Sequence, residues 1–192
     1  MAQHCDHDED ERGSQARLST ESFEVFFKTY WPRLVRVLIS LASDSSMAED
    51  VMSETFMAAW DKWDKVLTYD RPDSWLYKVA TRRLRRLEAQ ARARGSLAED
   101  PASIEADLRR AATTDEWVAS NLDLVAALRL LPRRQAEVVA WRLLEECTVK
   151  ETAEILGVSE GTVKTQLHRA RGKLQVLLND PEMTGLAGRD LS

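Results

Sequence analysis

Apolar residues recur every three or four positions along most of the chain, and this spacing is the strongest constraint on the fold. Side chains at that spacing share one face of an α-helix, whereas a half-buried strand requires strict alternation. Only 7 glycines and 5 prolines interrupt the pattern in 192 residues. The sequence therefore predicts an all-α protein. The clearest stripe, with steps of 4, 3, 4 and 3, is formed by Val163, Leu167, Ala170, Leu174 and Leu177.

Breaks in the spacing divide the chain into two helical domains and three less regular segments. Charged residues dominate the N-terminal segment, and the polar residues after Gly95 are typical of a linker. We therefore expect two small helical domains joined by a linker. The predicted boundaries are an acidic disordered tail over 1–20, a first domain over 21–95, a linker over 96–119, a second domain over 120–178 and a C-terminal tail over 179–192.

The first domain is predicted to have an aromatic core. Phe23, Phe26 and Phe27 begin an apolar stripe that continues past Pro32, and this proline should kink or restart the helix. A second apolar stripe follows over 51–63. We expect both of its tryptophans, at 60 and 63, to be buried.

A helix-turn-helix is predicted in the second domain, where the chain runs VSEGTVKTQLHRAR over 158–171. Gly157 can adopt the left-handed conformation that ends one helix, and Ser159 can cap the next. Ala153 is small where the two helices must approach closely. The outer faces of the second helix are polar and basic, which suits contacts with phosphates and base edges. The candidate DNA-binding residues are Ser159, Thr162, Lys164, Thr165, Gln166, His168, Arg169 and Arg171.

A second basic helix is predicted in the first domain, over 78–94. Seven arginines and lysines stand against Glu88 alone, so the helix carries a net charge of +6. Cationic side chains beside exposed aromatic rings can hold a single-stranded backbone and stack on its bases, and the preceding loop could receive an extruded base. For Trp75, a place in the core is an equal alternative. The candidate residues are Trp75, Tyr77, Lys78, Thr81, Arg82 and Arg85.

The formal net charge of −5 conflicts with two DNA-binding helices, because proteins that hold DNA unaided are usually basic. Cys5 and Cys147 are too far apart to suggest a disulfide framework, so we expect a reducing cytoplasm. No apolar run is long enough for membrane insertion, and the acidic start is not typical of a secretory signal. The run HCDH over 4–7 offers three metal ligands, but a disordered tail would not hold them in place.

The sequence contains no pattern typical of an enzyme. It has no glycine-rich phosphate loop, no plausible nucleophile and base, and no metal-ligand cluster in a predicted helix. We therefore expect neither catalysis nor a cofactor.

Two helical DNA-contacting domains on a linker resemble the bacterial RNA polymerase sigma factors of the extracytoplasmic-function (ECF) group, which keep regions two and four of larger sigma factors. In region two, AEDVMSETFMAAW (48–60) is similar to the family's AED-x-x-Q-E-T-F-x-x-A-W, and SWLYKVATRRLRR is similar to A-W-L-Y-x-I-A-x-N. In region four, the residues over 128–171 are similar to L-x-x-LP-x-RQ followed by EIA-x-x-LGVS-x-GTVKSRL-x-RAR. The resemblance covers about 21–178.

The resemblance implies a subunit that gives core RNA polymerase its promoter specificity. Region four would recognise the −35 element and contact the β flap, and region two would bind and open the −10 element. The helix over 48–60 would dock on the β′ clamp helices, and an anti-sigma factor is the family's usual regulator. The docking residues implied are Asp50, Ser53, Glu54 and Met57.

Four positions depart from the family pattern. Glutamine is usual at Ser53 and asparagine at Arg82, whereas aspartate is common at Arg86 and arginine at Gln166. We therefore expect an unusual promoter sequence or an unusual partner. The alternative function is a free-standing helix-turn-helix regulator that uses only 120–178, and specific DNA binding without polymerase would distinguish it. The acids of the N-terminal tail could also cover the basic helix over 78–94.

Overall fold

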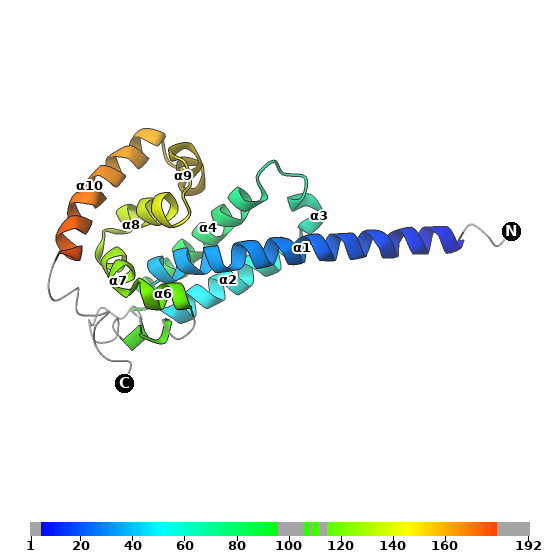
Figure 1. The fold of residues 1–192 in the computed structure, drawn as a ribbon, viewed down its shortest axis with the longest axis horizontal. Coiled ribbons are helices and arrows are strands. Elements are labelled where there is room, and N and C mark those ends of the chain that lie inside the picture. Colours follow the sequence, from blue (N-terminus) through cyan, green and yellow to red (C-terminus); the bar gives the residue numbers. More distant parts are fainter. Residues whose placement is uncertain (1–4, 96–105, 108, 112–114, 180–192) are drawn as a thin grey trace.

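The computed structural model describes residues 5–95, 106–107, 109–111 and 115–179, and this part of the chain is helical, with no strand in it (Figure 1). The all-α prediction is confirmed. The helices of the first half are α1 (Cys5–Leu41), α2 (Ser45–Trp60), α3 (Trp63–Val66) and α4 (Pro72–Ala93). Those of the second half are α6 (Glu116–Ser120), α7 (Leu122–Leu130), α8 (Arg133–Val139), the π-helical turn η1 (Ala140–Leu144), α9 (Val149–Leu156) and α10 (Glu160–Leu178).

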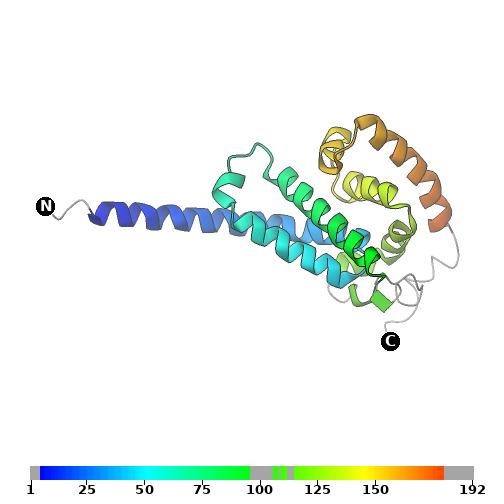
Figure 2. The same ribbon diagram turned by 180° about the vertical axis from the view of Figure 1, so that it is seen from behind.

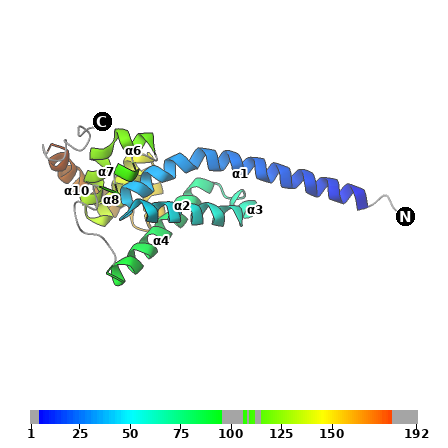
Figure 3. The same ribbon diagram turned by 90° about the horizontal axis from the view of Figure 1, so that it is seen from below.

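Helices α1, α2 and α4 form the first domain, with α2 packed against both of the others (Figure 2). Aromatic rings fill the space between α1 and α2. The Phe27 and Phe56 rings lie 4.9 Å apart, and the Phe26 ring lies 4.9 Å from that of Trp63. Aromatic packing before Pro32 and buried aliphatic residues such as Leu34 and Val37 after it hold the helix, so α1 continues through the proline instead of restarting there. Figure 3 shows the curvature of α1.

The long N-terminal extension of α1 differs from the predicted disordered tail. Helix α1 begins at Cys5, so residues 5–20 are helical and that part of the prediction is wrong. No proline precedes Pro32, and Gly13 is the single glycine of this stretch, so the sequence interrupts the helix only weakly. The side chains of the possible metal ligands over 4–7 lie outside the described residues, as do most of the predicted linker and the C-terminal tail.

The helix-turn-helix is formed by α9 and α10, as predicted. Gly157 ends α9 in the left-handed conformation at φ 68°, and the Ser159 Oγ accepts a hydrogen bond from the Thr162 N–H at 3.1 Å. Behind the turn, Ala153 and Val163 are buried. The two helices are therefore fixed by local chemistry and by a small shared core.

Gly157 and Gly172 should respond oppositely to replacement by alanine. Gly157→Ala is expected to lower the free energy of unfolding by about 1–2 kcal/mol, because a side chain is strained at φ 68° even though no atom lies within 4 Å of the added Cβ. Gly172→Ala, in the middle of exposed α10, is expected to raise it by about 0.5–1 kcal/mol. Urea titrations measure both, and equal effects of the two variants would contradict the backbone explanation.

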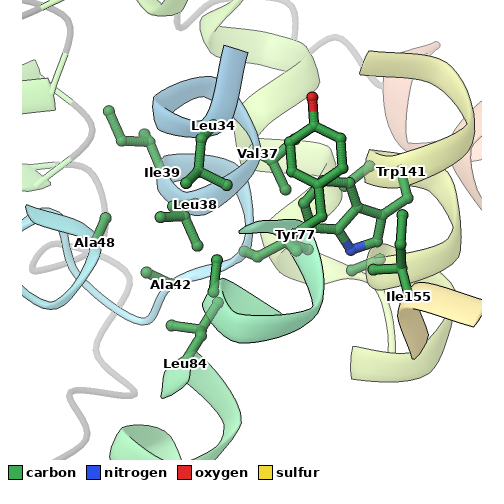
Figure 4. Packing of buried hydrophobic residues seen from close by; sticks show 14 of the residues in the cluster. Leu34, Val37, Leu38, Ile39, Ala42, Ala48, Tyr77, Leu84, Trp141 and Ile155 are labelled. Carbon is green, nitrogen blue, oxygen red and sulfur yellow. The ribbon is translucent and has the colours of Figure 1, made fainter. Parts of the chain in front are cut away.

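The two domains share one continuous hydrophobic core. Leu34, Val37 and Leu38 of α1 are buried, and so is Trp141 of η1 on the other side of the junction. Figure 4 shows Tyr77 of α4 beside the Trp141 ring, between α1 and the second domain. The chain therefore folds with its second domain packed against α1 and α4.

A short segment of the predicted linker also joins the domains. The Asp107 carboxylate accepts hydrogen bonds from the backbone N–H of Ser45 at 2.9 Å and from the Arg129 guanidinium at 2.9 Å. Arg129 in turn donates to the Ile39 carbonyl at 2.8 Å. Asp107 thus links the start of α2 to α7, so this part of the linker holds the two domains together.

Candidate nucleic-acid and polymerase interfaces

The basic helix α10 lies on the outer edge of the molecule (Figure 1). Of the eight residues predicted to bind DNA there, Thr162 and Gln166 are half-buried and the others are exposed. Neither half-buried side chain belongs to the core of the helix-turn-helix. Residues outside α10 must therefore cover part of each. The exposed residues are Ser159, Lys164, Thr165, His168, Arg169 and Arg171.

A hollow of about 510 Å³ accounts for the two half-buried side chains. Thr162 and Gln166 line its α10 side, and Arg85 and Arg92 line its α4 side. Arg134 of α8 also borders it. The side chains expected to recognise duplex DNA therefore face the arginines expected to hold single-stranded DNA.

The predicted exposed face of α4 is largely covered. Tyr77 and Thr81 are only 2% and 3% exposed, so the prediction that this face is open to bases is wrong for this structure. The physical reason is that α9 of the second domain packs on α4, and Trp141 of η1 lies against Tyr77. Trp75 is half-buried and packs against the core, whereas Arg82 remains exposed.

Carboxylates of the second domain bind the cations of this face. Both Glu137 oxygens accept from Arg85, at 2.8 Å from Nε and 2.7 Å from Nη2, and this pairing raises the pKa of the Arg85 guanidinium. Arg85 also donates to the Leu156 carbonyl at 3.2 Å. Glu154 lies 3.6 Å from the Lys78 ammonium. Bidentate pairing of arginine with a carboxylate is stronger than a single contact between lysine and a carboxylate. The Arg85–Glu137 pair is therefore the stronger of these two contacts between the domains.

A buried hydrogen-bonded cluster lies next to these ion pairs. The Tyr77 hydroxyl donates to the Glu145 carboxylate at 2.6 Å, and the Arg33 Nε lies 2.9 Å from the same oxygen. Burial raises the pKa of both Glu145 and Tyr77. The π-helical turn η1 places Glu145 here, directly after its last residue. Nothing in the sequence spacing indicates this cluster, because its members come from three distant segments.

The N-terminus of α9 carries a capping box that the sequence analysis did not include. The Thr148 N–H donates to Glu151 at 2.7 Å, the Glu151 N–H donates back to the threonine hydroxyl at 3.2 Å, and Arg71 also donates to Glu151. The Thr148 backbone bond is the largest of the causes that lower the pKa of the Glu151 carboxyl to about 2. The motif T-x-x-E, formed by Thr148 and Glu151, is the sequence pattern that predicts this capping box.

Glu151 should stabilise the fold in a pH-dependent way. Because its pKa is below the usual 4.5, its stabilising effect is complete above that pH and is lost as the pH falls toward about 2. Glu151→Gln is expected to cost about 1 kcal/mol at neutral pH, and the difference from wild type should shrink in that window. Urea titrations across pH measure it, with Glu154→Gln on the same helix as a control. A difference that is constant with pH would contradict this assignment.

An apolar groove lies between α1 and α2. It encloses about 330 Å³, and the walls include Phe23, Phe27 and Phe56, with Met57 and Trp60 at its edge. Met57 is 66% exposed and Trp60 is 48% exposed. The prediction that Trp60 is buried is therefore wrong, because Ala59 takes the inward position at the end of α2.

Two of the four predicted docking residues lie at this groove, and the other two lie elsewhere on α2. Ser53 and Met57 line the groove, and Asp50 is exposed. Glu54 is half-buried and accepts a hydrogen bond from Arg83. Sequence reasoning missed the contribution of α1. The sequence does contain a signal for this contribution: five aromatic residues lie over 23–31, which is more than one stripe of a helix can bury.

In the described part of the chain, no group of three His, Cys, Asp or Glu side chains is placed to hold a metal ion. In the same residues, no helix is long and apolar enough to cross a lipid bilayer.

Two family models match the chain. Residues 26–94 match sigma-70 region 2, and residues 121–174 match sigma-70 region 4. The region 2 match contains helices α2, α3 and α4, and the region 4 match contains α9 and most of α10.

Two curated relatives and one solved structure are similar to this chain over most of their length. The RNA polymerase sigma-E factor of Streptomyces coelicolor is 30% identical over 159 residues, which span 80% of this chain and 84% of the relative. The ECF RNA polymerase sigma factor SigM of Bacillus subtilis is 26% identical over 82% of this chain and 96% of its own. Sigma factor RpoE from Bartonella quintana, solved with the anti-sigma factor NepR, has a similar fold, with a TM-score of 0.63, 24% identity, and coverage of 84% of this chain and 99% of that one.

Proposed function

The chain belongs to the ECF group of bacterial RNA polymerase sigma factors, and from this premise we propose how its surfaces divide the task of promoter recognition. It binds core RNA polymerase and directs transcription initiation to particular promoters. We infer that it performs no catalytic step itself. Its chemistry is selective binding, and the polymerase supplies the active site.

The α1–α2 groove, with the adjacent α2 residues Asp50, Ser53, Glu54 and Met57, is the proposed polymerase-docking surface, and it carries the proposal. Met57 and Trp60 expose apolar surface at this groove, Asp61 adds negative charge to its lining, and the exposed Asp50 lies on the same helix α2. A partner that presents an apolar ridge beside basic side chains fits this surface. The β′ clamp helices are the proposed partner, and the β flap is the proposed partner of region four.

Helix α10 is the proposed element for −35 recognition. Its outer side chains are exposed, and its N-terminus is capped by Ser159, leaving backbone N–H groups of the first turn available to a phosphate. Gln166 is the proposed source of altered specificity, because glutamine makes paired hydrogen bonds with adenine, whereas arginine favours guanine. The full proposed set remains Ser159, Thr162, Lys164, Thr165, Gln166, His168, Arg169 and Arg171.

Two single substitutions test α10. Lys164→Ala and Arg171→Ala are each expected to weaken binding of the holoenzyme to promoter DNA about three- to tenfold, because each removes a charge from an exposed position. Filter binding at two salt concentrations measures affinity and its salt dependence. Lys150→Ala, an exposed lysine on α9, is the control, and unchanged binding in both α10 variants would exclude these residues from the interface.

Helix α4 is the proposed element that binds the −10 element as a single strand. Its free arginine, Arg82, and the covered residues Tyr77, Thr81 and Arg85 supply the cations and the ring needed for backbone contacts and stacking. Lys78 and Trp75 complete the proposed set. The covered residues can take this role only when region four moves away from α4.

An anti-sigma factor is a further proposed partner. A protein of similar fold was solved in complex with such a factor. The α1–α2 groove is the surface of this chain that an inhibitor would need to cover to prevent polymerase binding.

Transcription with purified core polymerase tests the proposal directly. A run-off transcript from a randomised promoter pool should require this protein, and the enriched sequences would identify both promoter elements. The absence of any transcript above that of core polymerase alone would overturn the proposal. Specific duplex binding by the free chain at physiological salt would instead favour the free-standing regulator.

A further inference from the structure

Charge is divided between two sides of region four. The segment over 137–154 contains five glutamates against Arg142 and Lys150, a net charge of −3. Helix α10 contains four basic residues against Glu160, a net charge of +3. The acidic segment packs against the basic helix α4, and α10 lies on the outer edge (Figure 1). Region four thus presents a negatively charged surface to α4, the helix proposed to bind the −10 element.

The carboxylates of this surface occupy positions where phosphates would be expected. Glu137 binds the fork of Arg85 with both oxygens, the same paired geometry that a phosphate adopts with arginine. Glu154 lies opposite Lys78, and Glu151 is bound by Arg71, in the loop before α4. All three cations belong to α4 or to the loop proposed to receive an extruded base.

An aromatic ring occupies the position where a base would be expected. The Trp141 indole lies on the Tyr77 ring, with centroids 4.7 Å apart and an interplanar angle of 38°. Stacking on a base would require this same face of the tyrosine. The Tyr77 hydroxyl is also occupied, since it donates to Glu145. Trp141 is fully buried, so no base can reach Tyr77 in this arrangement.

We propose that region four inhibits the free protein by acting as an internal substitute for single-stranded DNA, with Glu137, Glu151 and Glu154 in place of phosphates and Trp141 in place of a base. This inference depends on the proposed role of α4 in binding the −10 element. The free protein is then unable to bind single strands until its domains separate. Docking on polymerase, which holds the two regions apart on different subunits, releases α4.

Removing two of the carboxylates tests the inference in the full-length chain. Glu137→Gln with Glu154→Gln keeps the side-chain shapes but removes two charges from the interface. We expect this variant to bind a fluorescein-labelled single strand of about 12 nucleotides roughly tenfold more tightly than wild type at low salt. Glu24→Gln with Glu116→Gln, two exposed carboxylates on α1 and α6, changes the net charge equally and should leave binding nearly unchanged.

Small-angle X-ray scattering on the same samples measures whether the domains separate. The inference requires a larger radius of gyration in the interface variant together with tighter binding. It further requires that Arg85→Ala, added to that variant, removes most of the gain. An unchanged radius of gyration, or an equal gain in the control variant, would overturn it.

Holoenzyme measurements separate failure of this inference from failure of the proposed role of α4. If Arg85→Ala impairs promoter opening by the holoenzyme but the interface variant gains no affinity as a free protein, the role of α4 stands and the internal substitution is wrong. If Arg85→Ala leaves promoter opening unchanged, the proposed role of that residue is wrong, and the inference fails with it.

Discussion

Replacing Trp141 with alanine is expected to lower the free energy of unfolding by about 3–5 kcal/mol, the range for a fully buried tryptophan. Its side chain has no exposed surface, and the ring packs on Tyr77 at the junction of the two domains. Removing it would leave a cavity that neither domain can fill alone. Urea unfolding monitored by circular dichroism measures the loss.

Trp60→Ala provides the matched control for this prediction. Trp60 is 48% exposed, and its main ring contact is with Phe23, at a centroid distance of 4.9 Å. Its removal is expected to cost less than about 1.5 kcal/mol, because half of the side chain is already in water. Similar losses in the two variants would show that Trp141 does not hold the junction together.

Local chemistry explains why the helices were predictable from the sequence. Apolar spacing fixed which stretches are helical, and the turn of the helix-turn-helix followed from Gly157 and Ser159. Each of these signals acts within a few residues of its position in the chain. The tail was mispredicted over 5–20 because a charged composition was taken for disorder, although the segment contains no proline.

The contact between the domains was not predictable from the sequence because its residues are far apart in the chain. Tyr77 and Thr81 lie away from the apolar stripe of α4, so their spacing indicated an exposed face. Tyr77 packs against Trp141, more than sixty positions later, and Thr81 is buried as well. Glu137 and Glu145 appear in the sequence as ordinary surface acids. Only the folded arrangement shows that they pair with Arg85 and Tyr77.

The same arrangement bears on the conflict between a net charge of −5 and two DNA-binding helices. Glu137 and Glu154 pair with Arg85 and Lys78 of α4, and the basic residues of α10 are exposed. Charge is therefore balanced locally at the domain interface. A sigma factor of this kind does not need strong affinity for DNA on its own, since core polymerase supplies non-specific contacts.

Introducing charge into the α1–α2 groove is expected to have the largest effect on function. Met57→Asp combined with Asp50→Arg should weaken binding to core polymerase by about a hundredfold or more, because it places a carboxylate in an apolar contact and reverses the charge of an exposed residue on the same helix. Both positions are exposed on α2, so the helical content should stay the same. Pull-down with core polymerase and circular dichroism measure the two quantities.

Val25→Asp is the matched control for the docking surface. Val25 is 66% exposed, as Met57 is, and it lies on α1 without lining the groove. It should retain core binding, since it belongs neither to the groove nor to the adjacent α2 residues of the proposed docking surface. Wild-type binding by the α2 variant would show that polymerase docks elsewhere. Equal loss of core binding in both variants would place Val25 within the contact. The docking surface would then extend over α1 beyond the groove.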